Sequence, residues 1–241
     1  MSKKAIVVGA TSGIGRGIAE LLVSKGYIVG IAGRREHLLN EIKASSPSSY
    51  IVSTFDINNT QNVLEKLEDL ATQLGGVDLF ILSSGVGKRN KDLDLEPELD
   101  TIMTNVTGFT TAVNWAYKYF ENAGGGKLAS ISSIAGTRGF GLSPSYSASK
   151  SYQIKYLEAL RQKAKTTGGK ISVTDVRPGF VDTAMGNGDG AFWIAPVEKA
   201  SKQIVRAIDN NRGVVFVTKR WRIISILLRL IPRPVFERLK F

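Results

Sequence analysis

Short apolar runs alternate with longer amphipathic stretches along the chain, and this alternation constrains the fold most. The runs are AIVVGA, YIVGIAG, YIVSTFD, VDLFILSSG, KLASISS, ISVTDVRPG and GVVFVT. Most are rich in valine and isoleucine without two-residue alternation, which is typical of strands buried on both faces. Three of the helical patterns between them end at glycines, Gly26, Gly75 and Gly168. The pattern predicts an α/β fold with a doubly wound parallel sheet of about seven strands and helices on both faces.

The chain has 241 residues, 43% of them hydrophobic, which is enough for one large α/β domain with a sizeable core. No break in composition divides it. We therefore expect a single domain over residues 1–241, in which residues 219–241 form a basic, apolar helical extension. The first apolar run is too short for a signal peptide or a membrane span, so we expect no leader.

Two amino acids are scarce enough to exclude whole classes of chemistry. The chain has no cysteine, which rules out disulfides and thiolate catalysis. Its one histidine, His37, lies on the polar face of a predicted helix. A Ser-His-Asp hydrolase is therefore disfavoured, and we predict no metal site. The lack of cysteine agrees with a reducing compartment, and we expect a cytoplasmic protein.

A glycine-rich turn follows the first predicted strand and leads directly into a helix. Gly9, Gly13 and Gly15 have the spacing G-x-x-x-G-x-G, which differs from the usual G-x-G-x-x-G dinucleotide fingerprint. Glycines let the backbone approach a pyrophosphate, and a helix N-terminus supplies free N–H groups and partial positive charge. An ordinary glycine turn is the alternative, but the strand-turn-helix context favours a dinucleotide site.

The end of the second predicted strand bears on the choice between NAD and NADP. An acidic residue about 20 residues past the glycine loop would bond the ribose 2′-hydroxyl of NAD. Here Gly33 occupies that place, and Arg34 and Arg35 follow. Guanidinium groups suit a 2′-phosphate, so we expect NADP(H) in preference to NAD(H), with Arg34 the better candidate because it is nearer the strand end. The alternative places both arginines on the solvated first turn of a helix.

Tyr146 and Lys150 are four residues apart, a spacing that many helices show by chance. They follow Ser133, at the end of the fifth predicted strand. Taken with the glycine loop and the RPG turn after the sixth strand, these residues make the sequence resemble the short-chain dehydrogenase/reductase family from Ala5 to about Thr218. The resemblance implies a Rossmann-type fold and hydride transfer between a nicotinamide and a carbonyl or alcohol.

The resemblance also implies roles for the catalytic residues. Tyr146 would be the general acid in reduction and the base in oxidation. Lys150 would hold the nicotinamide ribose, and its charge would lower the pKa of the tyrosine. Ser133 would position the substrate oxygen, and Asn105 would link the lysine to solvent through water.

The implied cofactor site extends along the strand ends. Asp56 would bond the adenine amino group, although capping a helix is an equal alternative. The stretch LSSG at 82–85 stands where the family usually has Asn-Asn-Ala-Gly, so Leu82 removes the usual tie between this strand and its neighbour. The expected cofactor residues are Gly9, Thr11, Ser12, Gly13, Ile14, Gly15, Arg34, Arg35, Asp56, Ser84, Gly85, Tyr146, Lys150, Pro178, Gly179, Val181 and Thr183.

The loop from Asp182 to Ala195 is expected beside the substrate, at the carboxyl ends of the strands. Its apolar residues either close over an apolar substrate as a lid or pack on the core or a partner. These residues are Met185, Phe192, Trp193 and Ile194. We expect a small carbonyl or alcohol substrate that is partly apolar.

The C-terminal extension holds much of the net charge of +11, with seven basic residues and Glu237 between residues 219 and 240. Arg222, Ser225 and Arg229 form one polar stripe on an otherwise apolar helix. The apolar run stops at Pro232, far short of the ~20 residues needed to span a bilayer. We expect packing within the folded unit or a dimer, with contact to an anionic membrane as the alternative. Nucleic-acid binding is not expected, because the tail has no aromatic stacking pattern.

These features together predict an enzyme, an NADP(H)-dependent oxidoreductase that forms a homodimer or homotetramer, as is common in the family. The alternative is an NADP-binding interaction protein or membrane-peripheral protein with little catalysis. An epimerase or dehydratase is disfavoured, because little chain remains after the seventh strand for a substrate region.

Overall fold

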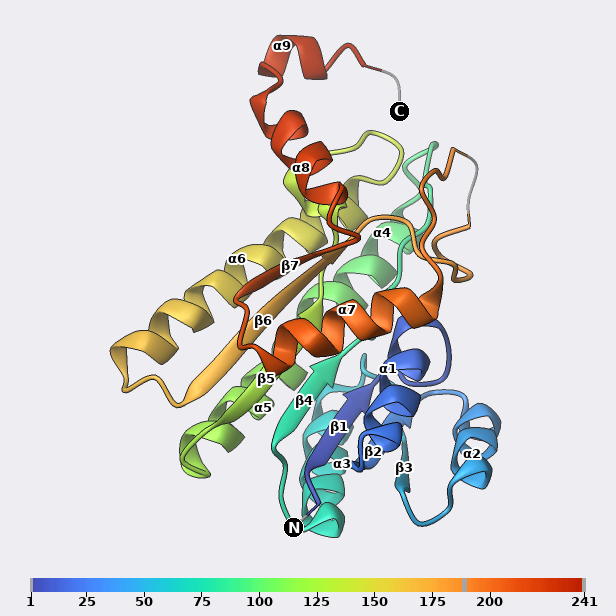
Figure 1. Cartoon of the computed structure of the whole chain (residues 1–241). Coiled ribbons are helices and arrows are strands. Elements are labelled where there is room, and N and C mark those ends of the chain that lie inside the picture. The colour runs from blue at the N-terminus through green and yellow to red at the C-terminus, as the bar shows by residue number, and fades with distance from the viewer. Residues whose placement is uncertain (1, 188–189, 240–241) are drawn as a thin grey trace.

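A sheet of seven parallel strands forms the centre of the protein (Figure 1). The structure is a computed structural model that describes residues 2–187 and 190–239. The strands are β1 (Lys4–Val8), β2 (Ile28–Gly33), β3 (Tyr50–Thr54), β4 (Leu79–Leu82), β5 (Gly126–Ile131), β6 (Ile171–Pro178) and β7 (Val214–Val217). Their order is β3-β2-β1-β4-β5-β6-β7, and every neighbouring pair is parallel. The predicted fold class is confirmed, and all seven apolar runs contain a strand.

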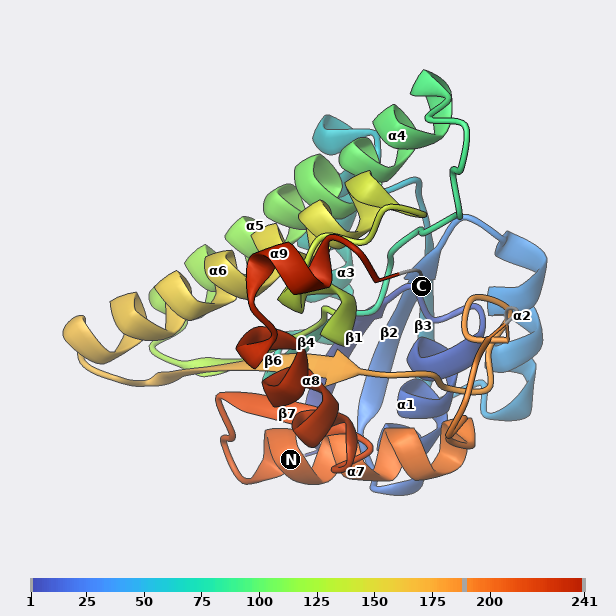
Figure 2. The same cartoon turned by 90° about the horizontal axis from the view of Figure 1, so that it is seen from above.

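Helices cover both faces of the sheet (Figure 2). One face carries α3 (Thr60–Leu74), α5 (Phe109–Asn122) and α6 (Pro144–Thr166), and the other carries α1 (Gly13–Ser24), α2 (Glu36–Ser45) and α7 (Val197–Asp209). Along β1, Ile6 and Val8 enter the first core, while Ala5 and Val7 enter the second. Successive side chains of a strand point to opposite faces. Because each face meets a core, the strands read as continuous apolar runs.

Three helices end where the glycine pattern predicted. Gly75 caps α3 in the left-handed conformation, with φ of 64°. Gly26 and Gly168 lie two residues beyond the last residues of α1 and α6, with φ of 83° and 106°. An L side chain is strained at such angles, so glycine ends these helices at low cost.

The strand order reverses between β1 and β4, which places a crevice at their carboxyl ends. Gly9 follows β1 there, and Ser84 lies just after β4. A Cβ atom on Gly9 would lie 2.5 Å from the Ser84 backbone nitrogen, and φ of Gly9 is +87°. Both observations require glycine at the point where the two strand ends meet.

The remaining helices lie at the carboxyl edge of the sheet or lead to it. They are α4 (Leu95–Ile102), the π-helical turn η1 (Met103–Gly108), the 3-10 turn η2 (Ile134–Thr137), α8 (Trp221–Leu230) and α9 (Arg233–Phe236). The predicted helical extension is therefore present, and α8 and α9 lie above the carboxyl ends of the strands (Figures 1 and 2). Within the described ranges, no helix is long and apolar enough to cross a membrane.

The predicted polar stripe of α8 is wrong at Ser225. This residue is buried, and its hydroxyl lies 3.1 Å from the Thr137 hydroxyl in η2. Arg222 and Arg229 are exposed. Two predicted segments extend outside the described residues: positions 188–189 of the loop 182–195 and positions 240–241 of the tail.

Candidate active site

The glycine loop brings the start of α1 against the turn that follows β6. A Cβ atom on Gly15 would lie 2.1 Å from the Gly9 carbonyl oxygen, and one on Gly13 would lie 2.9 Å from Thr183 Cγ2. Ser12 is the N-cap residue of α1, and within the described part of the chain its side chain makes no capping hydrogen bond. The first N–H groups of α1 therefore have no side-chain cap, which fits a phosphate at this helix terminus.

Arg35 and Arg34 point to different partners. Arg35 Nη2 donates to the Thr11 hydroxyl and, at 2.8 Å, to the Ser12 hydroxyl. Arg34 Nη1 lies 3.6 Å from Asp56 Oδ2 in an exposed ion pair. Since α2 begins at Glu36, the arginines precede the helix, and the interpretation that placed them on its first turn is wrong. Arg35, the residue ranked second from the sequence, is the one that contacts the glycine loop.

Asp56 lies in the turn that follows β3. Its Oδ1 accepts a hydrogen bond from Asn58 N at 3.0 Å. The N-cap of α3 is Asn59, whose Oδ1 accepts from Asn62 N at 3.2 Å. The helix-cap alternative for Asp56 is therefore wrong, and its carboxylate stays at the carboxyl edge of the sheet with Arg34.

The predicted catalytic hydroxyls meet between β5 and α6. Ser133 caps η2, and its Oγ accepts from Ala135 N at 3.1 Å. A hydrogen bond also joins the hydroxyls of Ser133 and Tyr146. Helix α6 starts at Pro144, a residue suited to a first helical position, so Tyr146 and Lys150 both lie in its first turns. The Lys150 ammonium lies 5.8 Å from the centre of the Tyr146 ring.

Burial sets the protonation of this pair. It raises the pKa of Tyr146, and the hydrogen bond with Ser133 opposes that shift. It lowers the pKa of Lys150 to about 8, and the charge of Asp175 opposes that shift. The lowering of the tyrosine pKa by Lys150, which the resemblance implies, stays a prediction. The ammonium donates to the Ile131 carbonyl at 3.0 Å and to Gln153 Oε1 at 2.9 Å.

Asn105 lies in the π-helical turn η1, and such turns are frequent at functional sites. Its side-chain amide makes two hydrogen bonds to the backbone of Val86. It donates to the carbonyl at 2.7 Å and accepts from the N–H at 2.9 Å. Its Nδ2 also donates to the Ser149 hydroxyl at 3.1 Å. The backbone oxygen of Asn105 accepts from Gln153 Nε2 at 2.8 Å. Asn105 thus fixes the segment after β4 against α6.

Two glycines of that segment approach the catalytic side chains. A Cβ atom on Gly85 would lie 3.3 Å from both Asn105 Oδ1 and Lys150 Nζ. One on Gly87 would lie 2.5 Å from Tyr146 Cδ2, so the backbone there packs directly on the phenol ring. The role of Gly87 was missed, and the Gly-Val-Gly spacing of residues 85–87 was its only sequence signal.

The turn after β6 is covered by a residue of the tail. Trp221 packs on Gly179, where a Cβ atom would lie 2.1 Å from the indole. Thr183 Oγ1 donates to the Val181 carbonyl at 3.2 Å and accepts from Gly186 N at 3.1 Å. Pro178, the last residue of β6, precedes this turn. Sequence reasoning missed the contact, because a tryptophan at the start of a basic tail does not reveal which turn it covers.

The aromatic residues of the loop 182–195 also pack on this tryptophan. The ring centres of Phe192 and Trp193 lie 5.0 and 5.8 Å from that of Trp221. Two arrangements were expected for this loop, a lid over the substrate or packing on the core or a partner. In the structure, its aromatic residues pack on the rest of the chain.

A buried ion pair supports the site from within β6. Asp175 accepts from Arg177 Nε and Nη2, each at 2.7 Å, and from the Ser132 hydroxyl. All three residues are buried. Burial raises the pKa of Asp175, while Arg177 and Ser132 oppose that shift. The D-x-R spacing on one face of a strand was the sequence signal that was overlooked.

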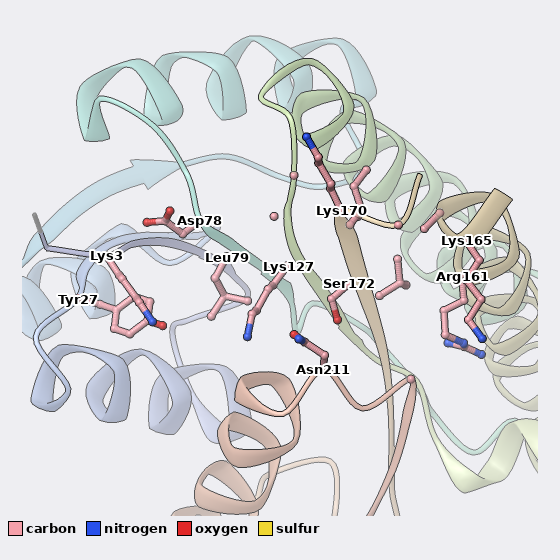
Figure 3. Close-up of a pocket in the computed structure, with 17 residues that line it drawn as sticks. Lys3, Tyr27, Asp78, Leu79, Lys127, Arg161, Lys165, Lys170, Ser172 and Asn211 are labelled. Atoms are coloured by element: carbon pink, nitrogen blue, oxygen red, sulfur yellow. The ribbon is translucent and has the colours of Figure 1, made fainter. Parts of the chain in front are cut away.

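A cavity of about 790 Å³ lies at the opposite, amino edge of the sheet (Figure 3). Lys3, Lys127, Arg161, Lys165 and Lys170 are among its lining residues, together with the start of β4 and β6. None of the predicted site residues lines it. Ligands of doubly wound sheets bind at the carboxyl ends of the strands, so size alone does not make this cavity the active site.

Comparisons with known proteins agree with this geometry. The model of the family described as short chain dehydrogenase matches residues 3–191. An uncharacterized oxidoreductase of Myxococcus xanthus is 32% identical over 98% of this chain and 95% of its own length. Another, from Mycobacterium tuberculosis, is 30% identical over 88% and 86%, and one from Staphylococcus aureus is 34% identical over 76% and 80%. The chain therefore belongs to the short-chain dehydrogenase family of oxidoreductases, which bind a nicotinamide cofactor.

Proposed function

We propose that the protein transfers a hydride between NADP(H) and a carbonyl or alcohol substrate, with Tyr146 as the general acid and base. One observation carries this proposal. Ser133 and Tyr146 share a hydrogen bond at the carboxyl edge of the sheet, where Lys150 approaches the same phenol ring. Proton donors placed together in this way can bind a carbonyl oxygen and protonate it as the carbon is reduced.

The cofactor would lie along the carboxyl edge from β3 to β6. The uncapped N-terminus of α1 suits its pyrophosphate, and Asp56 would face the adenine. Arg35 supports the preference for NADP(H), because its guanidinium already donates hydrogen bonds to the hydroxyls of Thr11 and Ser12 in the glycine loop. Arg34 would complete the 2′-phosphate site by leaving its exposed ion pair with Asp56. Val181 and Thr183 would meet the nicotinamide carboxamide.

The bound nicotinamide would supply or accept the hydride. In reduction, the substrate oxygen would accept hydrogen bonds from Ser133 and Tyr146, and the tyrosine would give up its proton as negative charge develops there. The raised pKa of Tyr146 keeps the phenol protonated at neutral pH, as an acid requires. Lys150 would hold the cofactor ribose, and Asn105 would hold the segment after β4 in place.

The test is consumption of NADPH by the purified chain across a panel of ketones, aldehydes and quinones, with NADH in parallel. The proposal expects turnover with at least one compound class, faster with NADPH, and loss of turnover in Tyr146→Phe. Tight NADPH binding with no turnover across the panel would contradict it and favour an interaction protein that uses the cofactor as a ligand.

A further inference from the structure

Helix α8 presents an apolar face that the described residues of its own chain leave exposed. Its buried residues, Trp221, Ser225 and Leu228, repeat at i, i+4 and i+7 and form the inner stripe. The opposite stripe consists of large aliphatic residues that are half exposed or more: Ile223 (61%), Ile226 (47%), Leu227 (52%) and Leu230 (72%). A run of such residues on one exposed helix face marks an interaction surface.

Positively charged residues lie beside this stripe. Arg222 and Arg229 are exposed and border it on one side. Among the described residues 219–239 there are six basic residues, Lys219, Arg220, Arg222, Arg229, Arg233 and Arg238. The one acidic residue, Glu237, already pairs with Arg233 at 2.6 Å. The surface therefore combines apolar side chains with an excess of cations.

We propose that α8 and α9 dock on the surface of an anionic lipid bilayer. The inner stripe of α8 already packs against η2 and β7, so the outer stripe faces away from the chain's own core. A second copy of the same surface would bring two sets of cations together, which costs energy. An anionic bilayer offers acyl chains to the aliphatic stripe and phosphate or carboxylate groups to the arginines. A helix of 10 residues is about 15 Å long, so it lies in the interface rather than crossing it.

The loop beside the candidate active site packs against the start of α8 through Trp221. Phe192 and Trp193 pack on Trp221, yet they remain 48% and 45% exposed. The Arg220 guanidinium lies 4.9 Å from the Trp193 ring centre. Tryptophan beside arginine is favoured at the water–lipid boundary, where the ring is half buried and the cation stays with the headgroups. Docking through α8 would bring the exposed parts of Phe192 and Trp193 close to the bilayer.

This placement points to a substrate class. The carboxyl edge of the sheet would face the membrane, so a carbonyl- or hydroxyl-bearing lipid would reach the site without crossing water. This step rests on the proposed hydride transfer, whereas the docking itself does not.

Flotation of the full chain with vesicles tests the docking. The protein should bind vesicles of phosphatidylcholine with phosphatidylserine, and bind vesicles of phosphatidylcholine alone much more weakly. Ile223→Ser with Leu230→Ser should weaken binding roughly 100-fold, because two exposed aliphatic side chains no longer enter the acyl region. Arg222→Gln with Arg229→Gln should weaken binding to the anionic vesicles roughly 30-fold and added salt should weaken it as well.

Matched variants of other exposed residues serve as controls. Leu64→Ser removes an exposed aliphatic side chain from α3, and Arg206→Gln with Arg212→Gln removes two exposed cations in and after α7. None of these changes should alter vesicle binding. Equal binding by wild type and the Ile223/Leu230 variant would overturn the proposal. So would failure of the wild type to bind anionic vesicles, or a change from dimer to monomer in the same variant without vesicle binding.

Activity is measured separately. With NADPH as the reductant, the wild type should reduce a long-chain ketone dissolved in anionic vesicles faster than the Ile223/Leu230 variant does. Both proteins should reduce a short soluble ketone equally fast. Vesicle binding without turnover of either ketone would contradict the proposed function and leave the docking intact. Turnover of the soluble ketone without vesicle binding would support the proposed function and overturn the docking.

Discussion

Gln153 and Lys150 are joined by a buried hydrogen bond in which the ammonium donates to the glutamine amide oxygen at 2.9 Å. The same amide donates to the backbone oxygen of Asn105 at 2.8 Å. The family resemblance implies that Asn105 links the lysine to solvent through water, and this stays a prediction. Protein atoms also connect Asn105 to the lysine through Gln153, so we propose that Gln153 is a positioning residue for the lysine.

Replacing Gln153 should shift the pH dependence of the reaction. A hydrogen bond accepted from a charged group contributes about 1.5–3 kcal/mol and favours the charged form. Gln153→Leu removes it, so the pKa of Lys150 should fall, and the alkaline limb of kcat/KM should move about 1–2 pH units lower. Gln153→Glu should move that limb higher. Profiles of kcat/KM against pH decide the matter, because a merely structural glutamine would change the rate at every pH without moving the limb.

Tyr146→Phe should remove the proton donor while leaving the cofactor site intact. General acid catalysis contributes roughly 10²–10⁴-fold, so kcat for carbonyl reduction should fall by about that factor. NADPH affinity, followed by fluorescence, should change little. Tyr152→Phe is the matched control on the same helix, since Tyr152 is exposed and its hydroxyl hydrogen-bonds with the Thr110 hydroxyl at 2.8 Å. Comparable losses in both variants would argue against Tyr146 as the acid.

Arg35 should matter more than Arg34 for NADPH. Losing a charge-assisted contact to the 2′-phosphate should raise the KM for NADPH by about 10–100-fold in Arg35→Gln, with kcat and the KM for NADH unchanged. Arg34→Gln should have a smaller effect of the same kind. Steady-state kinetics with both cofactors measure this, and Arg206→Gln is the remote control. An unchanged NADPH preference in Arg35→Gln would remove this residue from the phosphate site.

Lys150 should make folding stability depend on alkaline pH. Its pKa is about 8 in the fold, below the ordinary lysine value of 10.5. Between these values the unfolded chain binds more protons, so raising the pH through this window should stabilise the native state relative to Lys150→Met, by roughly 2–4 kcal/mol in all. Urea unfolding of both proteins at several pH values gives the comparison. A difference that stayed constant from pH 7 to about pH 10 would show that the lysine is not buried as described.

Asp175→Ala should destabilise the fold strongly, because the buried Arg177 would keep its charge without a counter-ion. Removing one partner of a buried ion pair costs about 3–5 kcal/mol. The exposed pair of Glu198 and Lys202 offers the control, since Glu198→Ala removes only a surface ion pair and should cost far less. Denaturant unfolding measures both changes. Similar losses in the two variants would mean that the Asp175 pair contributes no more than a surface pair.

Local patterns were sufficient for much of this protein. The seven apolar runs became seven parallel strands, because a strand buried on both faces needs apolar residues at every position. The glycines of the first turn were recognisable because close backbone approach excludes any Cβ atom. Tyr146 and Lys150 were recognisable because one helical turn places them on the same side of α6. Each of these inferences depends on residues that are near one another in the chain.

Contacts between distant segments were decided by the tertiary structure. Which arginine reaches the glycine loop depends on how β2 leads into α2, and the sequence ranking of Arg34 above Arg35 did not anticipate it. The bridge through Gln153 needs α6 to lie against η1, and the contact of Trp221 with Gly179 needs the tail to fold back over β6. Periodicity tells which side of a helix is apolar, but not which element will cover it. For that physical reason, the sequence by itself determined the strands, the glycine loop and the Tyr–Lys pair. Only the packing of helices on the sheet decided the partners of these residues and left the outer face of α8 exposed.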